Sequence, residues 1–297
     1  MKHKKKIFLI GGDGFVGRHF QKLYSKNYLF RVYDKSDNVL NYQNLIKSIN
    51  NFLPDYVINF ASYSTIDSAK IFQKELYDLS IHGNNNILKA LHEINFKGKY
   101  LYVSSGEVYG YSKTKKFSEL SSLNPMNEYA TSKVMAEALI KFKSQNSSYK
   151  TIIARPFNHF GPHQSVNFFI PQLLENIASQ VKNNSSEILL NIRNNHSKRS
   201  YLSVEDVCSA YLTILTKSNS EEYSVYNVCS SDSSTIPQLF SPLLQELNIK
   251  YSFIQSNENS FENTLQGNNK KILQLGWSPK KSLVKTLKEM YKNFLEK

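Results

Sequence analysis

Two side chains near the middle of the sequence form a pair that can move a proton. Tyr129 and Lys133 lie four residues apart, so a helix places the phenol and the ammonium on the same face. A neighbouring ammonium stabilises the phenolate and lowers the pKa of the tyrosine. Such a tyrosine can exchange a proton with a sugar hydroxyl or carbonyl while hydride moves to or from a nicotinamide. The spacing is common in a chain with 19 tyrosines, so its surroundings must support this interpretation.

Support comes from Ser104 and Ser105, which stand at the end of a buried strand predicted over 100–104. The carboxyl ends of parallel strands face the crevice in which open α/β sheets bind ligands. Ser105 can there hydrogen-bond the same oxygen on which Tyr129 acts. A serine at a strand end, followed by Tyr129 and Lys133 on the next helix, favours a redox enzyme.

A glycine-rich turn near the start of the chain predicts the site of a dinucleotide. Gly11, Gly14 and Gly17 stand between an apolar run at 7–10 and a segment from 15 with apolar residues at helical spacing. Glycines there permit a tight turn, let the main chain approach a pyrophosphate, and allow a helix to pack closely on a strand. The helix N-terminus supplies amide donors to the phosphates.

The choice between the two nicotinamide dinucleotides depends on Asp34, which follows a strand predicted over 29–33. A carboxylate at this point accepts hydrogen bonds from both hydroxyls of the adenosine ribose. This favours NAD(H), because the carboxylate would repel a 2′-phosphate. NADP(H) stays possible, since Lys35 and Arg18 lie close enough in the sequence to accommodate that phosphate.

Strands and helices alternate along the first half of the chain, which predicts an α/β fold with a doubly wound parallel sheet. The expected strands are 7–10, 29–33, 56–60, 100–104 and 151–155. The helices between them are expected from 15, at 42–51, as one long helix that ends near Ile94, and at 126–143.

The rhythm is less regular after Pro156, which favours a smaller second lobe interleaved with the sheet. Helices are expected at 168–181, 204–216, 237–247 and 282–295, and strands at 188–192 and 223–228. We therefore assign 1–165 to a dinucleotide-binding Rossmann domain to which 201–230 return, and 166–200 with 231–297 to a substrate-binding lobe.

The composition limits the class of partner. Lysine and arginine outnumber aspartate and glutamate by 37 to 24, which gives a formal charge of +13. Because the lysines are spread along the chain, we interpret them mainly as a solvated surface and expect no nucleic-acid partner. A positive field that gathers a diphosphate-bearing substrate is the milder alternative.

The apolar run at 7–10 is too short for export or for spanning a membrane, so we expect a cytoplasmic protein with no membrane partner. Cys208 and Cys229 have no metal-ligand neighbours, and no metal is expected.

Five further segments resemble the extended short-chain dehydrogenases/reductases, in their sugar-nucleotide branch. They are 54–61 (PDYVINFA), 103–110 (VSSGEVYG), 155–162 (RPFNHFGP), 198–207 (KRSYLSVEDV) and 225–230 (VYNVCS). Within the branch, the chain most resembles the GDP-6-deoxy-D-mannose 4-ketoreductases and the related GDP-mannose 4,6-dehydratases.

The resemblance implies a role for each matching residue. Tyr129 would be the acid/base, Lys133 would set its pKa and hold the nicotinamide ribose, and Ser105 would orient the reacting oxygen. Asn158 and Arg199 would hold the substrate diphosphate, for which a guanidinium fork is suited. The cofactor residues expected are Gly11, Asp13, Gly14, Phe15, Val16, Gly17, Asp34, Lys35, Asn38, Val39, Ala61, Ser62, Ser104, Tyr129, Lys133 and Pro156. The substrate residues expected are Ser64, Ser105, Glu107, Tyr129, Asn158 and Arg199.

The resemblance leaves the reaction open. In the 4,6-dehydratases the residue matching Glu107 removes a sugar proton, and several of these enzymes carry an aspartate just before it, where this chain has Gly106. GDP-mannose dehydratases lack that aspartate too, and Glu107 can equally hold a substrate hydroxyl. Three further residues differ from those usual in the family. Ile10 stands where many relatives have threonine, Ser80 where a mid-helix asparagine usually supports the active-site strand, and Ser200 where an aspartate usually follows the arginine.

The leading hypothesis is NAD(P)H-dependent reduction of a 4-keto 6-deoxy nucleotide sugar, GDP-linked by preference, in deoxysugar biosynthesis for surface polysaccharide. The enzyme alternatives are 4,6-dehydration and epimerisation with a bound cofactor. A different class is a Rossmann protein without catalysis that senses redox state or binds nucleic acid. Relatives pair through the helix that bears the tyrosine and lysine, so a homodimer is expected.

Overall fold

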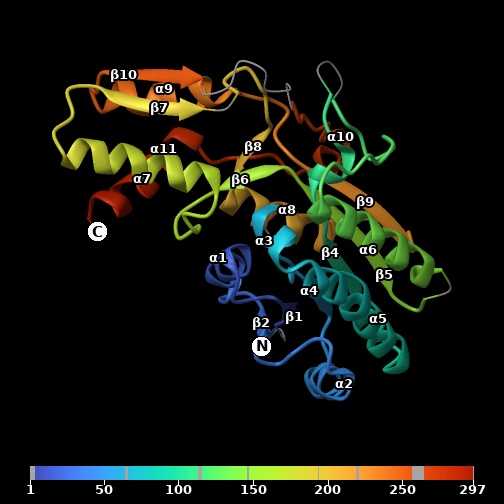
Figure 1. Cartoon of the computed structure of the whole chain (residues 1–297). Helices are drawn as coiled ribbons and strands as arrows, with labels where there is room; N and C mark the ends of the chain where they lie inside the picture. Colours follow the sequence, from blue (N-terminus) through green and yellow to red (C-terminus); the bar gives the residue numbers. More distant parts are fainter. Residues whose placement is uncertain are drawn as a thin grey trace.

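Six parallel strands form the central sheet, in the order β2-β1-β3-β4-β5-β9 (Figure 1). The computed structural model of the chain describes residues 4–63, 66–112, 116–145, 147–192, 194–218, 221–255 and 264–296. The strands are β1 (Lys6–Ile10), β2 (Leu29–Tyr33), β3 (Tyr56–Asn59), β4 (Lys99–Val103), β5 (Lys150–Pro156) and β9 (Tyr223–Val228). From β1 the chain first adds β2 on one side and then crosses to add β3 on the other side. Open parallel sheets bind ligands at the point where the strand order switches in this way. The predicted doubly wound parallel sheet is confirmed.

Helices cover both faces of this sheet, which explains why its inner strands are apolar without alternation. Ile7 and Leu9 of β1 pack on one face with α1 (Phe15–Tyr24) and α8 (Val204–Lys217). Phe8 and Ile10 of the same strand pack on the other face. The helices on that face are α2 (Tyr42–Phe52), α5 (Asn84–Glu93) and α6 (Glu128–Ser144).

The single long helix predicted to end near Ile94 is wrong in its first part, because the chain forms several short helical segments before α5. The segment comprises α3 (Ile66–Ile71), α4 (Gln73–Tyr77), a π-helical stretch η1 (Asp78–Gly83) and α5. A polar side chain explains the irregular turn. The Asn84 amide donates to the carbonyl of Ser80 at 2.8 Å, and its oxygen accepts from Tyr100 at 2.7 Å and Asn59 at 3.2 Å. Asn84 thus supports β3 and β4, one turn after the position at which the family resemblance places a supporting asparagine.

Outside the central sheet, the described residues form two small parallel sheets and a group of amphipathic helices that pack together. One sheet pairs β7 (Ile188–Ile192) with β10 (Tyr251–Gln255), and the other pairs β6 (Asn158–Phe160) with β8 (Tyr201–Ser203). The helices α7 (Phe169–Lys182), α9 (Ile236–Glu246) and α11 (Leu283–Leu295) share one apolar core. In Figure 1 they lie far from α2 and α5.

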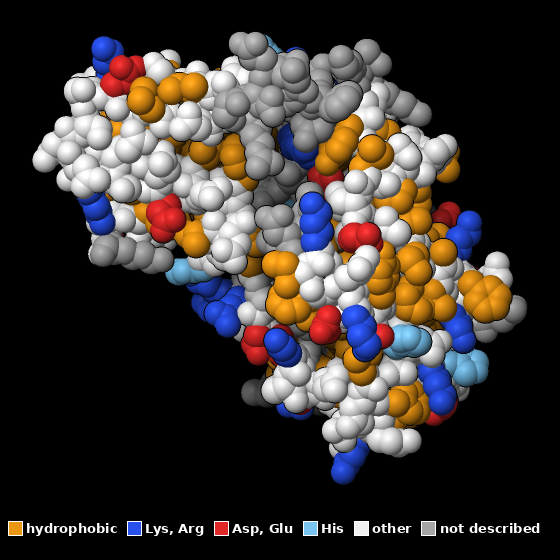
Figure 2. Space-filling model, viewed as in Figure 1, with side chains coloured by type: hydrophobic (Ala, Val, Ile, Leu, Met, Phe, Trp, Pro, Cys, Tyr) orange, Lys and Arg blue, Asp and Glu red, His pale blue; other side chains and the backbone are white. Residues whose placement is uncertain are grey.

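The strands β6, β8 and β10 and the short helix α10 (Lys270–Leu273) were not predicted. The division of the chain into a dinucleotide-binding domain and a substrate-binding lobe stays a prediction. None of the helices within the described ranges has the length and hydropathy that a membrane span requires. Lysine and arginine side chains are scattered among acidic ones over the face that Figure 2 shows.

Candidate active site

A cavity of about 1380 Å³ follows the carboxyl ends of the central strands and extends to the second lobe. Of the residues predicted for the site, those that line it are Gly11, Gly14, Phe15, Val16, Gly17, Asp34, Lys35, Asn38, Val39, Ala61, Ser62, Ser104, Ser105, Glu107, Tyr129, Lys133, Pro156, Asn158 and Arg199. Asp13 is not among the lining residues, and Ser64 lies outside the described residues. The structure therefore brings almost all of the predicted residues to one cavity.

The glycine turn lets the main chain pass closer than any side chain would allow. Gly11 has a φ of +74°, and a Cβ there would lie 2.7 Å from the nitrogen of Ala61. A Cβ on Gly17 would lie 2.3 Å from the carbonyl oxygen of Gly12. Gly14 precedes the first turn of α1 and makes no side-chain cap. The amides at the start of this helix can therefore serve a phosphate.

Main-chain amides hold the carboxylate of Asp34 in place. One oxygen accepts from the amide of Asp13 and the other from the amide of Lys35, both at 2.7 Å. Asp13 thus acts on the cofactor end through its backbone rather than as a lining side chain. Asn38 and Val39 line the cavity next to this carboxylate.

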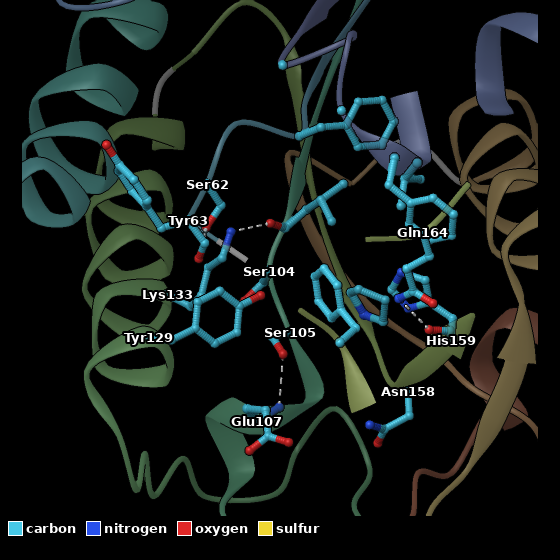
Figure 3. A pocket seen from close by; sticks show the side chains of 18 of the residues that line it. Ser62, Tyr63, Ser104, Ser105, Glu107, Tyr129, Lys133, Asn158, His159 and Gln164 are labelled. Carbon is cyan, nitrogen blue, oxygen red and sulfur yellow. Dashed lines mark hydrogen bonds between the residues drawn. The ribbon is translucent and has the colours of Figure 1, made fainter. Parts of the chain in front are cut away.

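Ser105 and Tyr129 line the cavity from the starts of two helices, η2 (Gly106–Tyr109) and α6. Ser105 caps the short helix η2 and accepts from the amide of Glu107 at 3.2 Å. Asn127 caps α6 by accepting from the amide of Ala130 at 2.8 Å, which fixes the first turn that carries Tyr129. Figure 3 shows Tyr129 and Lys133 side by side, facing Ser104 and Ser105.

Burial is the largest cause of the pKa shifts of Tyr129 and Lys133. Burial raises the pKa of Tyr129 to about 12, and the Ser105 hydroxyl, as its hydrogen-bond partner, opposes that rise. Burial lowers the pKa of Lys133 to about 7, and the nearby Glu137 carboxylate opposes that fall. The ammonium of Lys133 donates to the carbonyl of Val103 at 2.8 Å and lies 5.7 Å from the centre of the Tyr129 ring. Burial is the largest cause of the Tyr129 shift, and the lowering of its pKa by Lys133 together with a nicotinamide cation stays a prediction.

Glu107 and Arg199 meet across the cavity. The guanidinium of Arg199 donates to one oxygen of Glu107 at 3.0 Å, and the hydroxyl of Tyr111 donates to the other at 2.9 Å. The Arg199 guanidinium also lies 5.3 Å from the centre of the Tyr111 ring. The residue predicted to bind diphosphate is thus held by a carboxylate from the central domain, in a pairing that the sequence did not indicate.

Amide side chains line the opposite wall, as Figure 3 shows for Asn158 and Gln164. The Asn158 Oδ1 and Gln164 Oε1 atoms are buried and have no hydrogen-bond partner in the described part of the chain. Deeper in the second lobe, four further amide residues line the cavity: Asn167, Gln172, Asn191 and Asn194. Sequence reasoning missed these residues and Tyr111. Gln172 and Asn191 stand on a predicted helix and a predicted strand, but nothing in the sequence indicates that either element faces the cavity.

His159 lies in the same wall but is engaged in packing. Its Nδ1 lies 2.9 Å from the carbonyl oxygen of Phe157, and its ring stacks on Phe15. Burial lowers its pKa, so the ring is neutral at neutral pH. Among the described residues there is no cluster of three or more His, Cys, Asp or Glu that could hold a metal.

Comparison with known proteins supports a sugar-nucleotide enzyme. The chain is 29% identical to the GDP-6-deoxy-D-mannose reductase of Pseudomonas aeruginosa, over 96% of this chain and 95% of the relative. It is 27% identical to the human dTDP-D-glucose 4,6-dehydratase, over 98% of this chain and 91% of the relative. A solved structure of RMD from Pseudomonas aeruginosa complexed with NADPH matches with a TM-score of 0.86 and 27% identity, covering 99% of this chain and 98% of the other. The model of the NAD dependent epimerase/dehydratase family matches residues 7–229, and the chain belongs to this family.

Proposed function

We propose that the protein reduces a 4-keto 6-deoxy nucleotide sugar with a nicotinamide dinucleotide as the hydride donor. The observation that carries this proposal is the meeting of Ser105, Tyr129 and Lys133 in one cavity, between the glycine turn and an amide-lined wall. The reductase from Pseudomonas aeruginosa, similar over nearly the whole chain, supports the same reaction class.

A bound nicotinamide dinucleotide would supply hydride, and the residues present fit such a group. Gly11 and Gly17 leave room for a pyrophosphate beside the start of α1, and Asp34 presents a fixed carboxylate for the adenosine ribose. This carboxylate favours NADH, whereas Lys35 and the NADPH-bound relative favour the phosphorylated form. We propose NADH as the better donor and NADPH as the alternative.

The protonation state of Tyr129 suits reduction. Its pKa of about 12 keeps the phenol protonated at neutral pH, which is the form that donates a proton to a carbonyl oxygen. Ser105 would hold that oxygen, and the ammonium of Lys133 would stabilise the phenolate left behind. These three side chains would thus stabilise the negative charge that develops as the carbonyl is reduced.

The state of Glu107 favours reduction over dehydration. Each of its oxygens accepts one hydrogen bond, from Arg199 or Tyr111, and these partners hold the carboxylate in place rather than leaving it to approach a sugar carbon. Gly106, just before it, offers no second acid. Dehydration is the second candidate, since a carboxylate two residues after Ser105 lines the cavity and the human dehydratase is similar to this chain.

Incubation with two substrates separates the candidates. A reductase oxidises NADH or NADPH when given GDP-4-keto-6-deoxymannose and leaves GDP-mannose unchanged. A dehydratase removes water from GDP-mannose with no added cofactor. Turnover of dTDP- or UDP-linked 4-keto sugars in preference to the GDP-linked one would overturn the GDP assignment. No oxidation of either cofactor with any 4-keto sugar would overturn the proposal itself.

The proposed homodimer has support from apolar side chains that gather over α6 and its neighbours in Figure 2. Met135 and Phe142 are 44% and 68% exposed on α6, and Ile71 of α3 is 72% exposed. Met135 and Phe142 lie seven residues apart, on one helix face. Sedimentation of the protein and of the Phe142→Lys variant tests this surface: a dimer that dissociates in the variant supports it, and a wild-type monomer overturns it. The cytoplasmic location stays a prediction.

A further inference from the structure

A buried ion pair lies beneath the catalytic side chains and takes no direct part in the proposed reaction. Glu137 stands on α6, one turn after Lys133, and only 3% of it is exposed. Arg155 of β5, which is 5% exposed, donates to both Glu137 oxygens, from Nε at 3.0 Å and from its second terminal nitrogen. Two opposite charges are thus fixed within the protein interior.

The pair is the centre of a network that reaches the active-site strand end. The hydroxyl of Ser104 donates to Glu137, and Ser104 precedes the oxygen-orienting Ser105. On the other side, Arg155 donates to the hydroxyl of Tyr109 at 2.7 Å, which in turn donates to Asn227 at 2.7 Å. Glu137 therefore touches the strand end that carries Ser105 and stands on the helix that carries Lys133.

Stability alone does not account for this arrangement. A buried ion pair gives little net stability compared with well-packed apolar side chains of the same size, because both charges lose their water. The acceptor of the Lys133 ammonium is the neutral carbonyl of Val103. A buried carboxylate one turn away, in a medium of low dielectric constant, can hold that ammonium in its charged form.

We propose that Glu137 is a positioning residue, which keeps Lys133 in its ammonium form and fixes the Ser104 end of β4, while Arg155 limits the negative charge that reaches Lys133. Glu137 acts through Lys133 and Ser104 rather than on the substrate.

The other titratable groups around the pair are four tyrosines and two carboxylates, and none of them is among the causes of the pKa shift of Lys133. They are Tyr129 on α6, Tyr102 on β4, Tyr109 on η2 and Tyr223 on β9, with Glu107 facing Tyr129 and Glu119 facing Tyr109. Burial raises the pKa of each of the four tyrosines, so all are neutral at neutral pH. Burial lowers the pKa of Lys133 to about 7, and Glu137 raises it. Lys133 therefore carries its charge below that pH and loses it as the pH rises.

The test is the titration of Lys133 in the full chain. Competitive acetylation with acetic anhydride, followed by mass spectrometry of the peptide that contains Lys133, reports the unprotonated fraction against pH. Glu137→Gln keeps the size and an oxygen for Ser104 but removes the charge, so the midpoint should fall by about one pH unit. Glu137→Asp keeps the charge and should stay near wild type. Arg155→Gln leaves Glu137 unopposed and should raise the midpoint.

Opposite shifts in Glu137→Gln and Arg155→Gln are the signature that loss of structure alone would not give. Glu93→Gln, which removes a half-exposed carboxylate on the neighbouring helix, is the matched control and should leave the midpoint in place. If Arg155→Gln does not fold, the Gln and Asp variants at Glu137 decide the question. An unmoved midpoint in Glu137→Gln, or equal shifts in both Glu137 variants, would overturn the proposal.

A second measurement uses turnover and rests on the proposed function. The alkaline fall of kcat for the 4-keto sugar should move to lower pH in Glu137→Gln by the same amount as the acetylation midpoint. A wild-type protein that acetylates as expected but reduces no 4-keto sugar would remove the proposed function and leave the role of Glu137 standing. Shifted turnover with an unmoved acetylation midpoint would remove the role of Glu137 instead.

Discussion

The cofactor end and the substrate end of the cavity are built from different kinds of contact. At the cofactor end, the shape comes from the main chain, through Gly11, Gly17 and the amides that fix Asp34. At the substrate end, side chains make the wall, through the Glu107–Arg199 pair and amides such as Asn158. Main-chain geometry changes little when side chains are substituted, whereas a wall of side chains changes with each of them. Substrate choice can therefore diverge within a family while the cofactor site persists.

The largest effect should come from Tyr129, which stands where the two ends meet. Tyr129→Phe removes the proton donor but keeps the ring, so turnover should fall by about two to four orders of magnitude. Fluorescence titration with NADH should show an affinity within about twofold of wild type. Tyr63→Phe, at another tyrosine that lines the cavity, is the control and should retain most activity. Near wild-type turnover in Tyr129→Phe would remove the catalytic assignment.

A change in the main-chain end should damage folding and cofactor binding together. In Gly17→Ala the added carbon would lie 2.3 Å from the carbonyl oxygen of Gly12, so α1 must move away from the turn. We expect a loss of about 1–3 kcal/mol in the free energy of unfolding and weaker NADH binding, measured by thermal denaturation and titration. Gly14→Ala meets only the carbonyl of Gly11 at 3.3 Å and should unfold near the wild-type temperature. Equal Tm values for both variants would contradict the main-chain account.

The same contrast explains what could be predicted from the sequence. The glycine turn, Asp34 and the central strands follow local patterns, in which burial on both faces gives apolar runs and tight turns require glycine. Tyr129, Lys133 and Ser105 could be grouped because parallel strands end at one edge of the sheet. Each of these inferences needs only short-range periodicity and the order of elements.

Side-chain contacts between distant residues could not be predicted in this way. Arg199 and Glu107 are far apart in the sequence, and neither local pattern indicates that they pair. The break in the helix before α5 depends on Asn84, which bonds to Tyr100 in the neighbouring strand. The strand β10 forms only because β7 offers it an edge. Such features depend on the finished fold, which explains why the substrate end was less predictable than the cofactor end.

A substitution at the side-chain end should change substrate affinity alone. In Arg199→Met the diphosphate loses a charged donor, and KM for the 4-keto sugar should rise by about 10- to 100-fold. Both kcat and the NADH affinity should stay within about threefold of wild type. Lys198→Met, at the exposed cation next to it, is the matched control and should leave KM nearly unchanged. A fall in kcat with an unchanged KM would show that Arg199 acts in the chemical step rather than in binding.

The smallest effect should come from Asp34, whose carboxylate is held by main-chain amides at the cofactor end. Asp34→Asn keeps the shape and one acceptor oxygen but removes the charge that repels a 2′-phosphate. The ratio of kcat/KM for NADPH to that for NADH should therefore rise by about fivefold, because two unit charges about 4 Å apart in water interact by about 1 kcal/mol. Asp55→Asn removes a carboxylate at the opposite edge of the sheet, beside the start of β1, and should leave the ratio unchanged. If Asp34→Asn leaves this kcat/KM ratio unchanged too, the carboxylate does not select the cofactor. The main-chain amides of Asp13 and Lys35 would then decide which dinucleotide binds.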